Sequence, residues 1–356
     1  MTTETERTPT LEWRGDHIRI IDQTLLPGEL AMLDIRTPNE AVGAISRLAI
    51  RGAPALGAFG ALAIVVGLDT IAPTDLNEAR IALERLRTQI GNARPTAVNL
   101  RWAVDRVIEA ALSETRTSVA DLRSALLVEA LAIGAQDAFA CAEIGRLGRD
   151  LLANATNIGT HCNAGRLATA GIGTALAPMY TKSQAGEPVR AFAAETRPLL
   201  QGARLTAWEL ADAGIDVTVV SDGAMASLIL GGQLDAYIVG ADRIAANGDT
   251  ANKVGTVAHA LAAREAGIPF YVAAPTSTID VSVFDGSQIP IEHRDPDEVH
   301  HMGDQRLTPA GVKAANPAFD VTPHRFIDAI ITEVGVLRPP YIESIAAAST
   351  PPSRST

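Results

Sequence analysis

From residue 157 onward, short apolar segments alternate regularly with segments of helical pattern. The apolar segments are Asn157–Cys162, Val189–Glu195, Asp216–Ser221, Ala236–Asp242, Pro269–Pro275 and a last one near Ala329–Val334. Short apolar strands that alternate with helices are typical of right-handed crossover units, which form a doubly wound parallel sheet. We therefore expect an α/β protein.

The N-terminal part has a different pattern, with a small β element followed by helices. Residues 11–22 alternate in hydropathy around the turn Arg14-Gly15-Asp16 and predict a hairpin, and a further short strand is expected near Met32–Ile35. Helices then extend to about residue 153, with predicted starts at Thr37-Pro38-Asn39-Glu40, Thr74-Asp75 and Ser118–Asp121. We expect an N-terminal helical domain with a small β hairpin over 1–150, a parallel-sheet domain over 151–345 and a flexible tail over 346–356.

Composition argues against several kinds of partner. Acidic residues outnumber basic ones by 41 to 30, and the formal charge of −11 would repel a nucleic-acid backbone or an anionic membrane. The first ten residues are polar and no stretch of about 18 apolar residues is expected, which favours the cytoplasm. Cys141 and Cys162 are too few for a disulfide scaffold and lack the spacing of a zinc site, so we expect no metal.

Polar residues gather where the predicted strands end. The clusters are His161-Cys162-Asn163-Ala164-Gly165, Glu195-Thr196-Arg197-Pro198, Ser221-Asp222-Gly223 and Gly240-Ala241-Asp242-Arg243. Ligands of open parallel sheets bind beyond the carboxyl ends of the strands, where helix N-termini also point. Packing alone does not account for such repeated clustering, so we expect the active site there.

Cys162 and Asp242 are the candidate catalytic residues. A lone cysteine is more often a small buried hydrophobe, but Cys162 ends a strand before a glycine-containing turn into a helix, where amide dipoles favour a thiolate. Asp242 follows the apolar run Tyr237–Ala241, so desolvation is expected to raise its pKa and suit it to general acid catalysis. The alternatives for Asp242 are a helix N-cap and an ion pair with adjacent Arg243. Cys141, inside a helix, keeps a structural interpretation.

Three segments have the pattern of anion sites. Arg51-Gly52-Ala53 precedes Pro54, Arg94 precedes Pro95-Thr96, and Asn252-Lys253 precedes Val254-Gly255-Thr256. Each pattern predicts a helix start, where a basic side chain and free backbone amides face an anion together. An isolated Arg or Lys is usually a solvated surface charge, and the sequence does not show that the three segments meet.

Two other motifs carry less weight. Gly171–Leu176 imitates a dinucleotide-binding loop, but it lacks the third glycine and is expected within a helix rather than after a strand, so NAD binding is not expected. His300 and His301 are adjacent rather than one helical turn apart, and with His293 and Asp297 they predict a polar loop rather than a metal site.

These segments together resemble the methylthioribose-1-phosphate isomerase family over about residues 21–341. The matching motifs are Asp22–Pro27, Arg51–Ala55, Arg94–Leu100, His161–Gly165, Glu195–Arg204, Gly240–Ile244, Asn247–Lys253 and Ala274–Asp280. Glu292–Pro296 is similar to a Glu-Arg-Asp-Pro signature of the family, with His293 in a place that is often acidic. Arg166 and Asp222–Met225 also depart from the family pattern, which leaves fine substrate preference open but not the catalytic pair.

The resemblance implies an N-terminal helical domain joined to a Rossmann-like domain, assembled as a homodimer, with no cofactor. The implied reaction converts 5-methylthioribose 1-phosphate to 5-methylthioribulose 1-phosphate in methionine salvage. Asp242 would protonate the ring oxygen, and Cys162 would polarise or deprotonate the C2 side. By motif matching, the substrate and chiefly its phosphate would be held by Arg51, Gly52, Ala53, Arg94, Gln201, Asn252 and Lys253.

Three alternatives stay open. In the first, the substrate is 5-deoxyribose 1-phosphate or ribose 1,5-bisphosphate in place of the methylthio sugar. A second phosphate needs a further cationic cluster near C5, whereas a methylthio group needs an apolar slot. A regulatory protein that binds sugar phosphates without turnover is disfavoured by the presence of both Cys162 and Asp242. A nicotinamide dehydrogenase is suggested only by the alternation of strands and helices, and such sheets support many activities.

Overall fold

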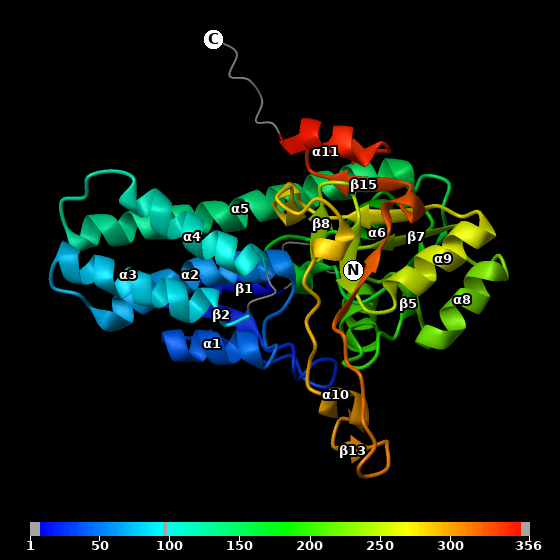
Figure 1. Cartoon of the computed structure of the whole chain (residues 1–356), viewed down its shortest axis with the longest axis horizontal. Coiled ribbons are helices and arrows are strands. Elements are labelled where there is room, and N and C mark those ends of the chain that lie inside the picture. The colour runs from blue at the N-terminus through cyan, green and yellow to red at the C-terminus, as the bar shows by residue number, and fades with distance from the viewer. Residues whose placement is uncertain (1–7, 95–97, 350–356) are drawn as a thin grey trace. The chain divides into compact units, whose positions relative to one another are not determined.

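The chain divides at Cys141, inside one long helix, and crosses between its two units again after Ala164 and after Gly173. This computed structural model describes residues 8–94 and 98–349 (Figure 1). The first unit takes the chain up to Cys141 together with Gly165–Gly173, and the second takes the remainder. The predicted boundary near residue 150 did not include this excursion of a nine-residue segment into the first unit, which has no signal in composition.

The first unit packs helices beside a three-stranded antiparallel sheet. Its elements are β1 (Leu11–Trp13), β2 (Ile18–Ile21), β3 (Met32–Ile35), α1 (Pro38–Ser46), α2 (Ala53–Ile71), α3 (Leu76–Gly91), α4 (Val98–Leu112) and the part of α5 (Val119–Leu151) up to Cys141. The predicted hairpin, third strand and capping box are confirmed. The Thr37 hydroxyl accepts from the Glu40 N–H over 3.2 Å, and the Glu40 carboxylate accepts from the Thr37 N–H over 3.0 Å.

Helix α2 is apolar on every side because it is surrounded by other elements of its unit. Ala55–Leu68 is buried throughout, and a Cβ added to Gly60 would lie 2.4 Å from a methyl group of Leu100 on α4. By length and composition α2 and α5 are both long and apolar enough to cross a membrane, which the sequence analysis did not anticipate. For α2 the qualifying window is 78% buried, as in the core helix of a folded unit.

The second unit is built on a seven-stranded sheet with the order β16-β15-β10-β7-β4-β5-β6. Its strands are β4 (Asn157–Thr160), β5 (Arg190–Ala194), β6 (Asp216–Val220), β7 (Ala236–Val239), β10 (Phe270–Ala273), β15 (Ala329–Thr332) and β16 (Gly335–Leu337). All are parallel except β16, which pairs antiparallel with β15 at one edge. Taken in chain order, the parallel strands lie 3-2-1-4-5-6, which is the Rossmann order. The predicted fold class and all six predicted strands are confirmed.

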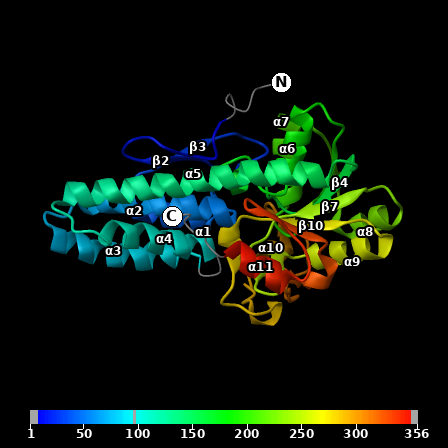
Figure 2. The same cartoon turned by 90° about the horizontal axis from the view of Figure 1, so that it is seen from above.

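Helices cover both faces of this sheet. Figure 2 shows α6 (Ala177–Gln184) and α7 (Ala207–Asp212) on one side and α8 (Asp222–Leu230) and α9 (Thr256–Ala266) on the other. The change of side falls between the crossovers that leave β4 toward β5 and those that lead from β6 to β7. Right-handed crossovers require this change wherever the direction of strand addition reverses.

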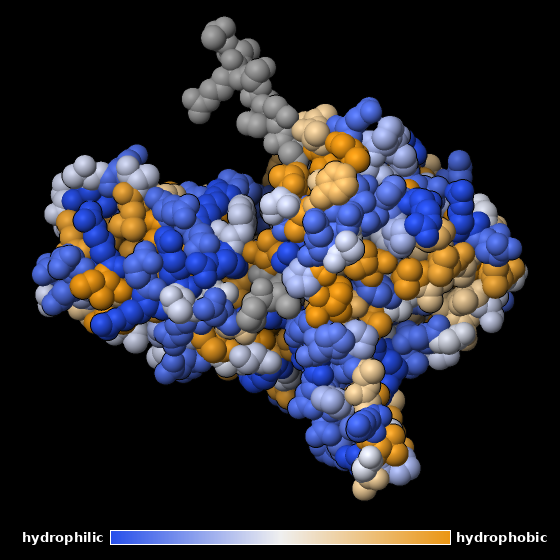
Figure 3. Space-filling view, in the orientation of Figure 1, coloured by the Kyte–Doolittle hydropathy of each residue, from blue (hydrophilic) through white to orange (hydrophobic). Residues whose placement is uncertain are grey.

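A second, four-stranded sheet follows the carboxyl ends of β7 and β10 and was not expected from the sequence. Its order is β11 (Ile279–Asp280), β8 (Arg243–Ala245), β9 (Thr250–Lys253) and β14 (Phe319–Thr322). Between β11 and β14, α10 (Asp297–His300) and the hairpin of β12 (His301–Met302) and β13 (Gln305–Arg306) project from this unit as an arm (Figure 1). Apolar side chains lie on the arm (Figure 3), where Met302, Leu307 and Val312 are exposed.

The C-terminal helix α11 spans Tyr341–Ser349. Residues 346–349, which the sequence placed in a flexible tail, therefore form its last turn. The remainder of that predicted tail lies outside the described residues.

Candidate active site

Cys162 and Asp242 follow the two strands that flank the reversal of strand order. Cys162 lies just beyond β4 and Asp242 just beyond β7, and the pairing of these strands aligns Gly159 with Tyr237. A Cβ added to Gly240 would lie 2.8 Å from the Cβ of Ala164, so the two strand extensions touch. The structure therefore brings both candidate residues to the edge of the sheet where α/β proteins bind their ligands.

Cys162 is held in a backbone conformation that is rare for a residue with a side chain. Its φ is 61°, in the left-handed region, which costs about 1–2 kcal/mol for an L-residue. Its N–H donates to the Thr196 hydroxyl over 2.9 Å, and its carbonyl oxygen accepts from the Thr206 hydroxyl over 2.6 Å. Such strain persists only where the surroundings impose it, and it is concentrated at functional sites.

The chain after Cys162 does not begin an α-helix, which corrects the sequence expectation. A 3-10 turn covers Arg166–Ala168, bends cover residues 169–172 and 174–176 on either side of an isolated bridge at Gly173, and α6 begins only at Ala177. Gly173 has a φ of 103°, which a right-handed helix does not accommodate. The helix-dipole argument for Cys162 therefore fails, and Gly171–Leu176 is not helical.

Asp242 precedes a strand rather than a helix, which excludes the N-cap alternative. Its N–H donates to the Ala251 carbonyl over 2.9 Å, at the start of the β8–β9 hairpin. Arg243 pairs with Asp280 at 3.5 Å. Because Arg243 lies opposite Ala251 in this hairpin, the register places Asp242 beside Asn252 on the neighbouring strand. The raised pKa of Asp242 stays a prediction.

Asn252 and Lys253 are buried on β9, so Lys253 is not a solvated surface charge. The Lys253 ammonium donates to the Ala318 carbonyl over 2.9 Å and lies 4.5 Å from the ring centroid of Phe319. The Asn252 amide donates to the Thr256 hydroxyl over 2.9 Å. A buried ammonium is costly to desolvate and is retained where it meets negative charge or fixed dipoles, as a phosphate-binding lysine does.

Gln201 has the signature of a ligand-binding side chain. It is 6% exposed, and its Oε1 atom has no hydrogen-bond partner among the described residues. Leaving such an acceptor buried and unsatisfied costs about 1–3 kcal/mol. Gln201 also lies directly before the π-helical turn Gly202–Thr206, whose Thr206 binds the Cys162 carbonyl. A donor such as a sugar hydroxyl would satisfy this oxygen.

The first unit holds the other predicted binding residues. Arg51 is buried, and α2 begins at Ala53 with no side-chain cap at Gly52, which leaves first-turn amides without a capping side chain. Gly52 has a φ of 96°, and a Cβ there would lie 2.5 Å from the backbone of Ala168. Arg94 is half-buried, while the helix start predicted at Pro95-Thr96 lies outside the described residues. The role of these residues in phosphate binding stays a prediction.

A buried polar network at the end of β4 was missed by sequence reasoning. The Tyr237 hydroxyl lies 2.9 Å from Nδ1 of His259 and 3.1 Å from the Thr160 carbonyl oxygen. Nε2 of His161 lies 2.9 Å from the Val254 carbonyl oxygen, and the two imidazole rings make an edge-to-face contact at 4.9 Å. The position of His161 next to Cys162 in a strand-end cluster was the signal that could have marked it.

Both histidines of this network are neutral at neutral pH. Burial lowers the pKa of His161 to about 4 and that of His259 to about 3, against an ordinary value of 6.5. Burial also raises the pKa of Asp320, which accepts from the Gly255 N–H, to about 6. The lowered pKa values of the two histidines together have a larger effect on the pH dependence of stability than the raised pKa of Asp320, which acts in the opposite direction.

We expect the free energy of unfolding to fall as the pH is lowered from about 6.5 to about 4. In that range the histidines bind protons in the unfolded chain but not in the folded protein. The contribution of each histidine to the free energy of unfolding is therefore complete above pH 6.5 and is lost as the pH falls toward its folded pKa. For His161 the full loss is on the order of 3 kcal/mol. Urea unfolding at a series of pH values measures it. His259→Gln should flatten the profile and exposed His293→Gln should not; a flat wild-type profile would contradict the expectation.

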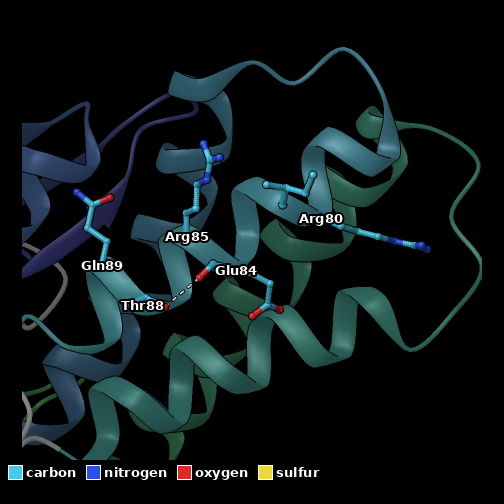
Figure 4. Close-up of a pocket in the computed structure, with 6 residues that line it drawn as sticks. Arg80, Glu84, Arg85, Thr88 and Gln89 are labelled. Atoms are coloured by element: carbon cyan, nitrogen blue, oxygen red, sulfur yellow. Dashed lines mark hydrogen bonds between the residues drawn. The ribbon is translucent and has the colours of Figure 1, made fainter.

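A shallow hollow in the first unit is not a candidate for the site. It is lined by six residues that all lie on α3: Arg80, Ile81, Glu84, Arg85, Thr88 and Gln89. Figure 4 shows these side chains along one helix, with the Thr88 hydroxyl donating to the Glu84 carbonyl over 3.2 Å. All six are exposed, so the hollow provides no enclosed, water-excluding space for a reaction.

Comparison with known proteins assigns the chain to a family. A sequence model of the initiation factor 2 subunit family matches residues 49–339. The chain belongs to this family. Among its relatives, a 5-deoxyribose 1-phosphate isomerase of Moorella thermoacetica is 51% identical and covers 97% of this chain and 98% of that protein. A methylthioribose-1-phosphate isomerase of Gemmatimonas aurantiaca is 50% identical and covers 94% and 95%.

Two solved structures superpose closely on this chain. A 5-methylthioribose 1-phosphate isomerase from Pyrococcus horikoshii OT3 superposes with a TM-score of 0.89 at 39% identity, covering 96% of each chain. A structure from A. fulgidus described as translation initiation factor eIF-2B subunit delta superposes with a TM-score of 0.84 at 38% identity, covering 96% of this chain and 100% of that one. The predicted family resemblance is confirmed, and the chain is an isomerase.

Proposed function

We propose that this isomerase converts 5-methylthioribose 1-phosphate to 5-methylthioribulose 1-phosphate, as a cytoplasmic homodimer in methionine salvage. The observation that carries the proposal is the placement of Cys162 and Asp242 on the two strand extensions at the reversal of strand order. An acid and a thiol at one end of the sheet suit a reaction that needs a proton at one atom of a sugar and removes one at another.

Ring opening is assigned to Asp242. The anomeric oxygen of the substrate carries phosphate, so the ring does not open to a free aldehyde without acid assistance. In the proposed step Asp242 gives its proton to the ring oxygen as the bond from that oxygen to C1 breaks, and positive charge develops at C1. This step needs Asp242 as the protonated carboxyl, which stays a prediction from the apolar run that precedes it.

Hydrogen transfer is assigned to the side of Cys162. In the hydride route the C2 hydrogen moves with its electron pair to C1, and the thiolate takes the proton of the C2 hydroxyl as the ketone forms. In the enolate route the thiolate takes the C2 hydrogen as a proton, which gives an enol. The thiol then returns a proton to C1, and the resulting thiolate takes the proton of the C2 hydroxyl as the ketone forms. Both routes end with the same ketose and the same atoms, and one proton transfer from the thiol to the carboxylate restores the enzyme.

The phosphate is assigned to cationic and amide groups of the chain. Lys253 and Asn252 are buried on β9, and Gln201 offers an unsatisfied buried oxygen to a sugar hydroxyl. By motif matching, Arg51, Gly52, Ala53 and Arg94 are further proposed phosphate ligands. Arginine forks and helix-terminal amides bind phosphate oxygens strongly.

A second candidate substrate is 5-deoxyribose 1-phosphate, because the Moorella relative with that name is 51% identical to this chain. The two substrates differ only at C5, where one has a methylthio group in place of hydrogen. An apolar group of this size changes kcat/KM by about 10–200-fold when its pocket is present or absent.

The test compares turnover of three sugar phosphates by the purified protein. We expect kcat/KM to be about tenfold higher or more for 5-methylthioribose 1-phosphate than for 5-deoxyribose 1-phosphate, with ribose 1,5-bisphosphate the slowest. Preference for the deoxy sugar would move the assignment to the second candidate. Binding without formation of a ketose would favour a regulatory protein. Running the reaction in deuterated water separates the routes, since solvent label enters C1 only through the enolate.

A further inference from the structure

Asp222, which the proposed chemistry does not use, accepts hydrogen bonds from the loop after β5 with both of its carboxylate oxygens. It is the first residue of α8 and follows β6, two strands away from the strand that carries Cys162. Oδ1 accepts from the Thr196 N–H over 2.8 Å, and Oδ2 accepts from the Arg197 N–H over 2.7 Å. The two oxygens of one carboxylate thus bind two consecutive backbone amides.

Thr196, one of the two residues whose backbone N–H binds Asp222, is a second strained residue. Thr196 has a φ of 66°, in the same left-handed region as Cys162. Its hydroxyl, fully buried, donates to the Ala194 carbonyl over 2.9 Å and accepts from the Cys162 N–H over 2.9 Å. The Asp222 carboxylate therefore fixes the residue whose side chain fixes the backbone of the thiol.

The other side of Cys162 is secured by a separate set of groups. The Thr206 hydroxyl donates to the Cys162 carbonyl, and the amide of buried Asn163 donates to the Thr206 oxygen over 3.2 Å and to the carboxylate of fully buried Glu209. With Thr206 holding the carbonyl, the Thr196 contact decides how the N–H side of Cys162 is turned. The orientation of a side chain follows from that of its own backbone.

We propose that Asp222 is a positioning residue for Cys162, acting through the Thr196 hydroxyl to hold the thiol in its left-handed backbone conformation. Asp222 does not touch the reacting atoms in this scheme. A misplacement of about 1 Å in a reacting group costs up to about 10²-fold in rate, so a remote carboxylate with this geometry affects turnover more than substrate binding. The effect on turnover rests on the proposed function, whereas the effect on the thiol itself does not.

The experiment measures both turnover and the reactivity of the thiol in Asp222→Asn. The Asn side chain offers a single acceptor oxygen, whereas the two backbone N–H groups each need an acceptor. Its NH₂ group would therefore face a backbone N–H donor. We expect kcat to fall about 10–100-fold with KM within threefold, and the rate of alkylation of Cys162 by iodoacetamide to change at least fivefold. Mass spectrometry assigns the label to Cys162, since Cys141 is fully buried.

Three further variants make the test specific. Asp216→Asn, at the exposed start of the same strand, should leave both rates within twofold. Thr196→Val keeps the shape of the side chain and removes the acceptor, so it should reproduce the effect of Asp222→Asn, whereas Thr196→Ser should not. In the Thr196→Val background, Asp222→Asn should cost less than threefold more, because both act on one contact.

Distinct outcomes overturn the proposal or the function on which it rests. Unchanged alkylation and unchanged kcat in folded Asp222→Asn overturn the positioning role. Full additivity with Thr196→Val overturns the relay through Thr196. If alkylation responds as expected while Cys162→Ser turns over substrate at the wild-type rate, the positioning role stands and the proposed function fails. Thr196→Val supplies the same decision if Asp222→Asn does not fold.

Discussion

Replacing Asp242 with asparagine is expected to lower kcat about 10³-fold while the protein stays folded. A positioned general acid contributes about 10²–10⁴-fold, and an amide has no proton to give to the ring oxygen. The substitution keeps the size of the side chain and leaves the bond from its N–H to the Ala251 carbonyl in place. Steady-state assay of ketose formation, with the thermal unfolding midpoint recorded beside it, measures the effect.

The control for this prediction lies at the other end of the same strand. Asp235 precedes β7, and its Oδ2 accepts from the N–H groups of Thr156 and Asn157 over 2.9 and 2.7 Å. Asp235→Asn should therefore lower the unfolding midpoint and leave kcat within twofold. If Asp242→Asn keeps more than a tenth of the wild-type kcat, the carboxyl is not the acid.

Cys162→Ser is the second large effect, with an expected loss of about 10³-fold in kcat. The serine hydroxyl has nearly the same shape but is a far weaker acid than a thiol, so it does not supply the base required on the C2 side. Both backbone hydrogen bonds, to Thr196 and from Thr206, are retained. The assay is the same, with a D₂O arm to see whether residual turnover uses the same route.

Two matched variants separate the thiol from the backbone that carries it. Cys162→Gly removes the thiol and the strain together, so kcat should vanish while the free energy of unfolding rises by about 0.5–1 kcal/mol, the difference between relieved strain and glycine entropy. Cys141→Ala removes the other thiol, which is buried in the first unit, and should keep kcat within twofold. Activity of Cys162→Ser above a tenth of wild type, or its loss in Cys141→Ala, would contradict the assignment.

The strands of the Rossmann sheet could be predicted because their signal is local. A buried strand such as β7 (Ala236–Val239) needs a short apolar run, and the turn after it needs polar or glycine residues; neighbours along the chain meet both needs. The capping box at Thr37 is equally local, since its partners are three residues apart. The four-stranded sheet was missed because β8, β9, β11 and β14 are short and contain polar residues that only pairing between distant segments makes regular.

At the site, too, the sequence predicted what depends on neighbouring residues and missed what depends on contacts between distant segments. The cluster around Cys162 and the apolar run before Asp242 predicted which residues lie at strand ends, because strand ends are a property of nearby sequence. The unsatisfied oxygen of Gln201 and the burial of Lys253 depend on what surrounds them, so residue type alone could not distinguish them from surface groups.

The family and the fold class could be read from the sequence, and so could the strand ends that carry Cys162 and Asp242, since each of these follows from residues close together in the chain. The folded protein alone shows that the two strand extensions touch at Gly240, that Cys162 has a left-handed backbone, and that Thr196 bonds to its N–H and is itself bound by Asp222. The strained backbone is maintained by hydrogen bonds that join the ends of β4, β5 and β6, and the order in which strands pair is set by packing rather than by any one segment.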